Sequence, residues 1–576
     1  MDILKKIQEC AKQYPQRIAF RRGCEDAISY GELWDYSERL AAWLMEHADE
    51  DRTPMAVYGH KHPWMLVCFL ACVKSGRAYC PIDISVPDAR VEATLAALPS
   101  RYVLATEELC ADVGEKQVLG LDALRHILGD EDGFWRGAEQ KKTDSATGKE
   151  NIGFNTDGKE ILHVIAEENW VHGNETYYII FTSGSTGTPK GVQITADCLN
   201  YYLDWSTGLG SSPEAKQGQV FLNQAPFSFD LSVMDLYTSL ASGGTLYCLE
   251  KTVQSDYRAL LQGLAASKAQ VWVSTPSFAD VCLSDKSFDR ELLPELEVFL
   301  FCGETLTNKT ARKLQERFPG AKVINTYGPT ESTVAVTDVL VTQELAVLEE
   351  PLPVGSPKPG TKIEIWDEDG NVLPEGEKGE IIILGDTVST GYYGRPDLTE
   401  KSFFVSEHCV RGYHTGDKGY LKNGMLYYCG RIDLQIKLHG YRIELEDVES
   451  NISKLPQVEH AVVVPGIRGG KVSSLTAYIV KRPLEDNCAS VSGSGSERTV
   501  DELAKLRSDL KQFLPDYMIP KKIVFVDELP MTNNGKVDRK RLAQDGVLGR
   551  KTTCVEPNKA ILTKNHEVQK SGGTVE

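Results

Sequence analysis

The sequence lacks any long hydrophobic run. No stretch of about 18 apolar residues occurs among its 576 residues, so no segment is predicted to span a membrane. The N-terminal segment MDILKKIQECAKQYPQ also lacks the apolar core of a secretory signal peptide. These absences lead us to expect a cytoplasmic protein without a membrane-inserted segment.

Positive charge is scarce. Lys and Arg together number 63 against 82 Asp and Glu, which gives a formal net charge of −19 at pH 7. A chain this acidic is not expected to bind nucleic acid or an anionic membrane. A small anionic ligand stays possible, because it needs only a local basic site.

Regular cysteine spacings and internal repeats are also absent. The fourteen cysteines are scattered, and Cys68 and Cys72 lie in the apolar run LVCFLACVKSG, which is typical of a buried helix. We therefore expect free thiols rather than a disulfide or zinc framework. No repeat of solenoid period occurs, which excludes a repeat architecture.

The sequence does contain an alternation of helical patterns with short β-branched runs. Helical patterns such as 257–268 and 308–318 alternate with runs at 102–106, 177–182, 220–224, 270–275, 298–303 and 322–328. This alternation predicts βαβ units in a largely parallel sheet. After about residue 350, short segments joined by Asp-Gly and Asn-Gly turns predict antiparallel strands.

The chain is too long for one ordinary core. We predict an α/β fold with a large N-terminal domain at 1–432, made of βα sheets and a small β-rich subdomain. A small α+β domain at 433–545 and a disordered tail at 546–576 are predicted to follow.

Local patterns refine this division. In the small domain, residues 441–455 and 501–514 are predicted helices. Two polar stretches interrupt the regular pattern: residues 131–175 are predicted to be an irregular insertion, and the Ser/Gly-rich residues 484–499 a flexible loop.

The stretch FTSGSTGTPKGVQIT, residues 181–195, follows a predicted strand and combines Gly, Ser and Thr with a lysine. Its glycines allow backbone N–H groups to turn toward an oxyanion, and Lys190 adds a point charge suited to a polyphosphate. It is not a Walker A loop, because Pro189 stands where that pattern needs glycine. From composition alone, an idle surface loop is the alternative.

Further motifs in a fixed order favour the phosphate loop. They are NTYGPTES (325–332), GEIIILGDTVSTGYYGRPDLTEKSFF (379–404), YHTGDKGYL (413–421), GRIDLQIKLHGYRIELEDVE (430–449) and PMTNNGKVDRKRL (530–542). Together with residues 181–195 they resemble the AMP-forming adenylate superfamily of acyl-CoA synthetases, luciferases and peptide-synthetase adenylation domains. The resemblance covers roughly residues 180–542, and both polar interruptions lie outside the motifs.

The resemblance implies a two-step reaction with ATP. A carboxylate attacks the α-phosphorus to give an acyl-adenylate and pyrophosphate, and a thiol then attacks the activated carbonyl and releases AMP. Lys536 would be the catalytic lysine, in contact with ATP and the substrate carboxylate. Glu331 would hold Mg²⁺, which prefers oxygen ligands. The implied ATP-binding positions are Thr182, Ser183, Gly184, Thr186, Lys190, Asn325, Thr326, Tyr327, Gly328, Pro329, Thr330, Asp417, Tyr428, Cys429, Gly430, Arg431 and Lys536.

Two of these motifs carry more specific roles. By the resemblance, Asp417 and Arg431 hold the ribose hydroxyls, and Asp433 is the hinge of a mobile C-terminal domain. Rotation about this hinge after adenylation would withdraw Lys536 and bring residues 436–442 to the active site. A simple interdomain linker at Asp433 is the alternative, and both can hold.

The segment PFSFDLSVMDLYTSLASGGTL, residues 226–246, indicates which class of acid is the substrate. Asp230 matches the aspartate that amino-acid-activating members place against the substrate's α-ammonium group. A fatty acid would leave this carboxylate unpaired in a buried site, which argues against an acyl-CoA ligase. A helix N-cap is the alternative role for Asp230.

The side-chain pocket is predicted to be small and apolar. Its positions by resemblance are Leu231, Met234, Leu300, Cys302, Thr326, Val334 and Ala335. The motifs look closest to members that activate D-alanine, in which a cysteine at the place of Cys302 shapes the pocket for the D-enantiomer. Cys302 could instead be a core thiol that borders the site. L-alanine or glycine, used by a stand-alone peptide-synthetase-type enzyme, stays an alternative substrate.

The acceptor thiol is expected to come from another molecule, because no GxDS-type phosphopantetheine attachment site occurs in the chain. By resemblance, the partner is a small, separate carrier protein, and the D-alanine serves teichoic acids of a Gram-positive envelope. A non-catalytic nucleotide binder is disfavoured, because Lys536, Glu331 and Asp417 are all present.

Overall fold

The computed structural model of the chain describes residues 2–23, 26–48, 50–129, 164–183, 189–209, 218–468, 471–482, 495–531 and 537–548. It forms two compact units, residues 1–447 with 513–517 and residues 448–512 with 518–576. The mixed α/β class is confirmed, whereas the hinge at Asp433 stays a prediction. No helix among the described residues is both long and apolar enough to cross a bilayer.

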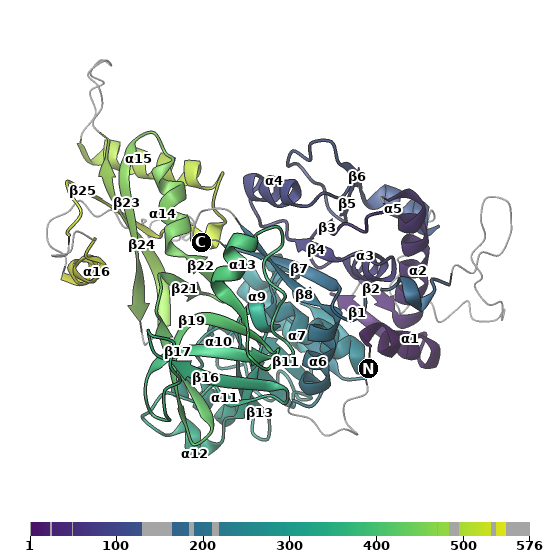
Figure 1. The fold of residues 1–576 in the computed structure, drawn as a ribbon. Helices are drawn as coiled ribbons and strands as arrows, with labels where there is room; N and C mark the ends of the chain where they lie inside the picture. The colour runs from purple at the N-terminus through teal and green to yellow at the C-terminus, as the bar shows by residue number, and fades with distance from the viewer. Residues whose placement is uncertain are drawn as a thin grey trace, which may run out of the picture. The chain divides into compact units, whose positions relative to one another are not determined.

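A nine-stranded sheet runs through the described part of the first unit (Figure 1). Its strands β13, β12, β11, β9, β10 and β1 are neighbours and run parallel, as the alternating pattern predicts. In sheet order the strands are β15 (Ser356–Pro357), β14 (Thr337–Leu340), β13 (Lys322–Tyr327), β12 (Val298–Phe301), β11 (Val271–Ser274), β9 (Val220–Asn223), β10 (Thr245–Cys248), β1 (Ile18–Arg22) and β2 (Asp26–Ser29).

A second sheet of the same unit is parallel except for its last strand, β8, which is antiparallel to β7. In sheet order its strands are β6 (Gln117–Leu119), β5 (Tyr102–Ala105), β3 (Met55–Tyr58), β4 (Tyr79–Ile82), β7 (Thr176–Thr182) and β8 (Lys190–Thr195).

Helices pack on these sheets. Helix α3 (Pro63–Lys74) is buried on every side and includes Cys68 and Cys72, which confirms the predicted buried helix. The other helices of the unit are α1 (Ile3–Gln13), α2 (Tyr30–His47), α4 (Asp88–Ala97), α5 (Leu121–Leu128), α6 (Ala196–Ser206), α7 (Leu231–Ala241), α8 (Lys251–Ser255), α9 (Tyr257–Ser267), α10 (Pro276–Cys282), α11 (Asn308–Arg317), α12 (Gln343–Ala346) and α13 (Pro396–Ser402).

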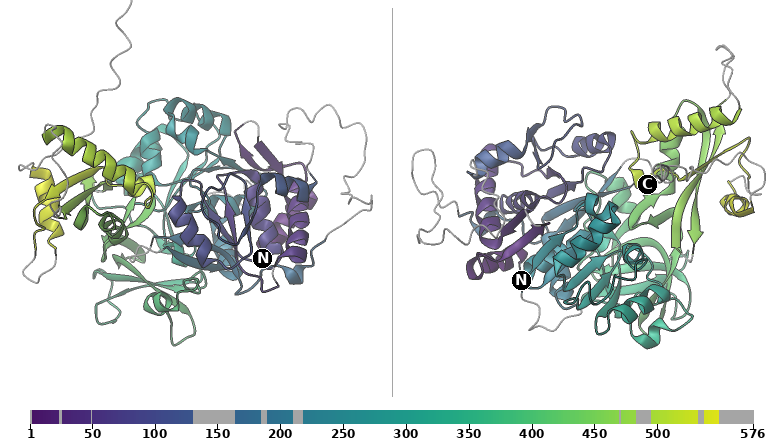
Figure 2. Two further views of the ribbon diagram at one scale, coloured as in Figure 1. Left: turned by 90° about the horizontal axis from the view of Figure 1, so that it is seen from above. Right: turned by 180° about the vertical axis from the view of Figure 1, so that it is seen from behind.

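The predicted β-rich subdomain is a five-stranded antiparallel sheet, in green in Figures 1 and 2. Its strands are β16 (Thr361–Trp366), β17 (Gly379–Gly385), β18 (Phe403–Val405), β19 (Arg411–Lys422) and β20 (Met425–Arg431). Asn423 and Gly424 both have positive φ and join β19 to β20, as an Asn-Gly hairpin requires.

The predicted helix at 441–455 is wrong in its first four residues. Strands β21 (Gln435–Leu438) and β22 (Tyr441–Glu444) form a hairpin, and helix α14 (Leu445–Ser453) begins only after it. His439 and Gly440 have φ of 53° and 84°, so a two-residue turn favours strand pairing over the helical pattern.

The second unit is the predicted α+β body. Its sheet has the order β23 (Val458–Arg468), β24 (Lys471–Lys481) and β25 (Lys522–Val526), with helices α15 (Gly495–Leu510) and α16 (Arg539–Leu548). Residues 495–499, predicted to belong to a flexible loop, are helical, and so are 546–548 at the start of the predicted disordered tail. The rest of both segments lies outside the described residues.

The predicted insertion at 131–175 also needs correction at its end. Residues 131–163 lie outside the described residues, but Trp170 is 2% exposed and meets the Trp34 ring at 5.9 Å. Because the Trp170 ring is buried in the core, residues 164–175 are part of the packed domain and do not extend from it.

Candidate active site

The carboxyl ends of five strands converge on one cleft. Thr182 ends β7, and the loops after β9, β11, β12 and β13 bring Asp230, Thr275, Cys302 and Gly328 to the cleft lining. Ligand sites in parallel sheets form at this edge.

Asp230 is a buried carboxylate at the start of α7. Its Oδ2 accepts a hydrogen bond from the Thr330 hydroxyl at 2.7 Å, and its side chain makes no bond to its own helix. Asp230 thus occupies the N-cap position of α7, but its carboxylate does not cap the helix. Burial raises the pKa of the Asp230 carboxyl, while the Thr330 hydrogen bond opposes this rise.

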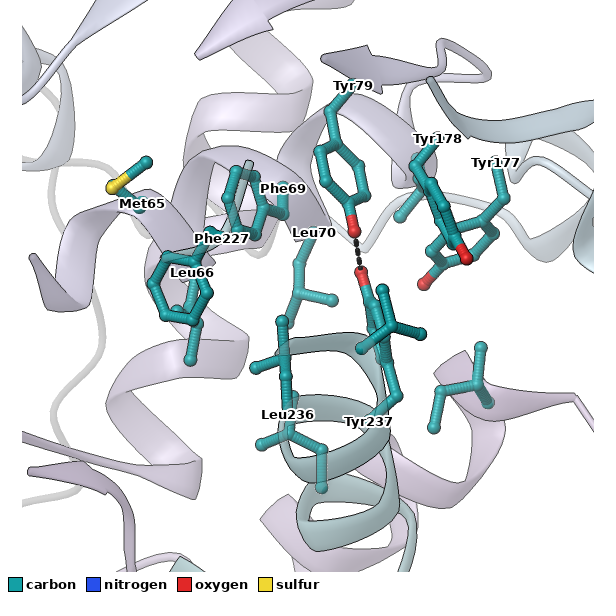
Figure 3. Close-up of a cluster of buried hydrophobic side chains, with 14 of the residues drawn as sticks. Met65, Leu66, Phe69, Leu70, Tyr79, Tyr177, Tyr178, Phe227, Leu236 and Tyr237 are labelled. Atoms are coloured by element: carbon teal, nitrogen blue, oxygen red, sulfur yellow. Dashed lines mark hydrogen bonds between the residues drawn. The ribbon is translucent and has the colours of Figure 1, made fainter. Parts of the chain in front are cut away.

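Helix α7 gives Asp230 a firm base, because residues 231–240 are all buried. Figure 3 shows Tyr237 of this helix meeting Tyr79, with their hydroxyl oxygens 2.7 Å apart. Asp235 accepts two hydrogen bonds from the Asn223 amide at 3.0 and 3.1 Å. These contacts fix the helix against both sheets and so fix where Asp230 lies.

The wall beside Asp230 is apolar and tightly built. A Cβ at Gly328 would lie 2.5 Å from Ala335 Cα, so only glycine allows this approach. Val334 has φ of 67°, a strained conformation for a β-branched residue, and its carbonyl accepts from Cys302 Sγ at 3.6 Å. Leu231, Cys302 and Val334 line the cleft, whereas four other predicted pocket residues are buried outside its lining: Met234, Leu300, Thr326 and Ala335.

Asp417 and Arg431 are brought together as the resemblance implies. Arg431 Nη1 donates to Asp417 Oδ1 at 2.9 Å, and the Tyr327 hydroxyl donates to Asp417 Oδ2 at 2.6 Å. Arg431 also donates from Nε to Asp433 at 2.8 Å. The Tyr428 ring lies 6.1 Å from that of Tyr327. The arrangement presents one well-oriented carboxylate that can accept hydrogen bonds from hydroxyls.

Glu331 is fully buried among positive groups. Arg442 Nη1 donates to both carboxylate oxygens at 2.9 and 2.7 Å, and the Tyr392 hydroxyl donates at 2.8 Å. Lys190 Nζ lies 3.6 Å away. Burial alone would raise the pKa of the Glu331 carboxyl, but Arg442 and Lys190 hold it well below its usual range. Burial and the neighbouring Arg442 lower the pKa of Lys190 to about 8.

The β21–β22 hairpin contributes Gln435, Lys437, Gly440 and Arg442 to the cleft lining. The rotation that was expected to bring residues 436–442 there stays a prediction. The Ser183 hydroxyl donates to the Arg442 carbonyl at 3.0 Å, and the Gly440 N–H donates to Glu304 at 2.7 Å. A Cβ at Gly440 would lie 2.4 Å from Thr275 Cγ2, so this contact also requires glycine.

Sequence reasoning missed Tyr392, Glu304 and Tyr517, whereas Tyr441 and Arg442 belong to the segment 436–442 that it expected at the site. Tyr441 stacks on Tyr517 with ring centroids 3.6 Å apart, and Tyr392, Glu304 and Arg442 make the contacts just described. Tyr392 and Arg442 stand inside quoted motifs, but nothing in the sequence shows that both meet Glu331.

The remaining predicted ATP-binding residues are placed as follows. Thr182 donates to the Lys190 carbonyl at 3.5 Å, Asn325 to the Pro353 carbonyl at 2.9 Å, and Thr326 to the Phe301 carbonyl at 2.9 Å. Pro329 and Thr330 line the cleft, while Cys429 is exposed beside Gly430. Gly184, Thr186 and Lys536 lie outside the described residues.

Comparison with known proteins agrees with this geometry. The family model for the AMP-binding enzyme matches residues 7–393, and that for the AMP-binding enzyme C-terminal domain matches residues 447–536. The chain belongs to the AMP-binding enzyme family. Its predicted membership of the AMP-forming adenylate superfamily is thereby confirmed, and this is a family of ATP-using ligases.

Two curated relatives cover nearly the whole chain. The D-alanine–D-alanyl carrier protein ligase of Bacillus licheniformis is 46% identical over 95% of this chain and 99% of the relative. That of Bacillus velezensis is 43% identical over 95% and 99%. Among solved structures, the Vibrio cholerae adenylation domain AlmE, in complex with glycyl-adenosine-5'-phosphate, has a TM-score of 0.76 at 22% identity over 95% and 98% of the two chains, which shows the shared fold.

Glu331 is the residue that is expected from the sequence to hold Mg²⁺. Among the described residues, no group of three or more His, Cys, Asp or Glu side chains is arranged to hold an ion. Mg²⁺ needs no such cage, because it is usually bound through one or two carboxylates plus substrate phosphates and water. Glu331 is a single buried carboxylate 3.6 Å from Lys190 Nζ, and it could bind a metal in this mode only after its present donors, Arg442 and Tyr392, are displaced.

Proposed function

We propose that this AMP-binding enzyme activates D-alanine with ATP and transfers it to the phosphopantetheine thiol of a separate carrier protein. The observation that carries the proposal is Asp230, a buried carboxylate that faces an apolar wall and is bonded by the Thr330 hydroxyl. Relatives of 46% and 43% identity over 99% of their length are named for this activity.

In the first step, Asp230 binds the α-ammonium group of D-alanine, and the methyl group lies against Cys302 and Val334. The substrate carboxylate oxygen attacks the α-phosphorus of ATP, the bond to the β-phosphate oxygen breaks, and pyrophosphate leaves. Asp417 accepts hydrogen bonds from the ribose hydroxyls. Lys536 bridges the substrate carboxylate and the α-phosphate, where negative charge accumulates. Glu331 would hold Mg²⁺, which would supply positive charge at the phosphates.

In the second step, the carrier thiol sulfur attacks the D-alanyl carbonyl carbon. The carbon–sulfur bond forms, the bond to the AMP phosphate oxygen breaks, the thiol proton passes to solvent and AMP leaves. Residues 433–545 act as a mobile domain that turns about Asp433 between the two steps. Lys536 serves the first step, and residues 436–442 line the cleft in the second.

The proposal has three further parts: the stereochemical preference, the location and the fate of the product. Cys302 and the strained Val334 set the preference for the D-enantiomer by closing one side of the pocket. The enzyme works in the cytoplasm, and its product serves the D-alanylation of teichoic acids.

ATP–pyrophosphate exchange tests this function. Exchange is measured with D-alanine, L-alanine, glycine and D-serine as the only amino acid. The proposal requires D-alanine to give the highest kcat/KM. A preference for L-alanine or glycine would assign the protein to the peptide-synthetase type, and no exchange with any of them would overturn the role of Asp230.

A further inference from the structure

The carboxylate of Glu331 is already surrounded by hydrogen-bond donors and cations, which a bound metal ion would have to displace. Arg442 Nη1 bridges both of its oxygens, the Tyr392 hydroxyl donates to one, and Lys190 Nζ lies 3.6 Å away. An ionised carboxylate has about four lone-pair positions, and three of them are directed at these donors. In this arrangement, therefore, the Glu331 carboxylate has little capacity left for a divalent cation.

Charge leads to the same conclusion. Glu331 is fully buried, and the Arg442 side chain is only 14% exposed. Two cations already face one carboxylate there, and burial strengthens the repulsion that any further positive charge would meet. A divalent ion on Glu331 would stand against the guanidinium of Arg442, so each disfavours the other.

Arg442 reaches Glu331 only as part of the β21–β22 hairpin. Its own carbonyl accepts from the Ser183 hydroxyl, at the first residue after β7, and the Gly440 N–H at the hairpin turn donates to Glu304. The Tyr441 ring also packs against Phe229 and Tyr517, with ring centroids 4.7 and 3.6 Å apart. Of these contacts, Arg442–Glu331 is the one that involves the proposed metal-binding residue.

The other contacts of Arg442 are weak. Its Nε is buried without a hydrogen-bond partner and lies 4.0 Å from Glu444. Burying a guanidinium is costly unless a carboxylate compensates its charge. Glu331 is that carboxylate, so a metal ion on Glu331 would remove the charge compensation on which the buried Arg442 depends.

We propose that Arg442 takes the place of the divalent cation on Glu331, so that the hairpin at 435–444 docks only after the metal and pyrophosphate have left. Arg442 is then a positioning residue that keeps the two half-reactions in order. This inference rests on the proposed role of Glu331 as the metal-binding residue. It predicts competition between a side chain and a metal ion, which can be measured without turnover.

Metal affinity is the first test. Mn²⁺ binding is followed by electron paramagnetic resonance in the presence of AMP and pyrophosphate, for the wild-type protein and for Arg442→Gln, Arg442→Lys and Arg395→Gln. Arg395 is the matched control, because it pairs with Asp397 at 2.8 Å outside the cleft.

When Arg442 occupies Glu331, only the remaining fraction of the protein can bind the metal. The apparent affinity for the metal is the intrinsic affinity multiplied by that fraction. Arg442→Gln should therefore bind Mn²⁺ about fivefold more tightly than the wild-type protein, or tighter still. The Mn²⁺ affinity of Arg442→Lys should lie between those of the wild-type protein and Arg442→Gln. The lysine ammonium group is a point charge and lacks the planar two-pronged geometry of the guanidinium group. Arg395→Gln should match the wild type. Equal affinities for the wild-type protein and Arg442→Gln would overturn the proposal.

Amide hydrogen exchange across residues 435–444 is the second test. With AMP alone, the wild-type hairpin should be protected, and Mg²⁺ with pyrophosphate should remove that protection. In Arg442→Gln the same amides should exchange fast under both conditions. The proposal would be contradicted if Arg442→Gln kept the wild-type protection of these amides. It would also be contradicted if Mg²⁺ with pyrophosphate left the protection of the wild-type hairpin unchanged.

Two further measurements separate this inference from the proposed function. Glu331→Gln should lose Mn²⁺ binding, and if it does not, Glu331 is not the metal-binding residue. D-alanine-dependent pyrophosphate exchange by the wild-type protein tests the function itself. Exchange that is present while Arg442→Gln leaves Mn²⁺ affinity unchanged would overturn the inference alone.

Discussion

The hydroxyl of Thr330 donates a hydrogen bond to the carboxylate of Asp230 at 2.7 Å. The two residues are 100 positions apart and belong to the loops that follow β13 and β9. The bond satisfies one lone pair of a buried carboxylate and leaves its other oxygen for a substrate ammonium group. It thereby connects the residue proposed to select an amino acid with the motif proposed to bind the nucleotide.

Asp230→Asn should weaken D-alanine binding and spare ATP binding. The charge-assisted contact with the ammonium group is worth about 1.5–3 kcal/mol, which is on the order of a 10- to 150-fold rise in KM for D-alanine. Pyrophosphate exchange gives KM, and equilibrium titration gives the ATP affinity. An unchanged KM would remove Asp230 from the substrate site.

The same residue predicts a pH dependence. Burial raises the pKa of Asp230 in the free protein, and a bound ammonium group would lower it again. Binding of D-alanine is therefore complete above the raised pKa and is lost as the pH falls through it. KM for D-alanine should rise on acidification at a higher pH than an ordinary aspartate would give. In Asp230→Asn, KM should be flat over this range, and a wild-type profile in that variant would assign the titration to another group.

Cys302→Ala should relax the preference for the D-enantiomer. The Cys302 side chain is 3% exposed, lines the cleft and is held by the Val334 carbonyl, so its removal enlarges one side of the pocket. The ratio of kcat/KM for D-alanine and L-alanine should fall by about tenfold, since one lost small group is worth roughly 1–3 kcal/mol of discrimination. Cys68→Ala, in the buried helix α3, is the control and should keep the parental ratio. The same ratio in Cys302→Ala would mean that Cys302 only fills space.

Lys536→Ala should abolish adenylation, because the variant lacks the positive charge between the substrate carboxylate and the α-phosphate. ATP binding should persist, and so should transfer from D-alanyl-adenylate supplied ready-made. Lys540→Ala, an exposed lysine on α16, serves as the control. Substantial pyrophosphate exchange by Lys536→Ala would assign this charge to another residue.

Features that depend on local pattern were predictable from the sequence. The parallel strands were found because β-branched runs alternate with helical patterns, and the Asn423-Gly424 turn because its residues tolerate positive φ. Asp417 and Arg431 were found through their motifs, and they meet because β19 and β20 pair in that register.

Features that depend on tertiary packing were not. Residues 441–444 have a helical pattern but pair with β21, since the His439-Gly440 turn brings the two strands together. Trp170 sits in a polar stretch, and its ring is buried against Trp34. The Arg442–Glu331 contact joins residues 111 positions apart, and it exists only when the hairpin lies in the cleft. No local signal predicts such a contact.

The most direct test of the central claim is the mass of a phosphopantetheinylated carrier protein after incubation with this enzyme, ATP, Mg²⁺ and one amino acid. We expect the addition of one alanyl group with D-alanine, little with L-alanine or glycine, and none when ATP is omitted. No added mass with D-alanine, or a larger yield with L-alanine or glycine, would contradict the central claim.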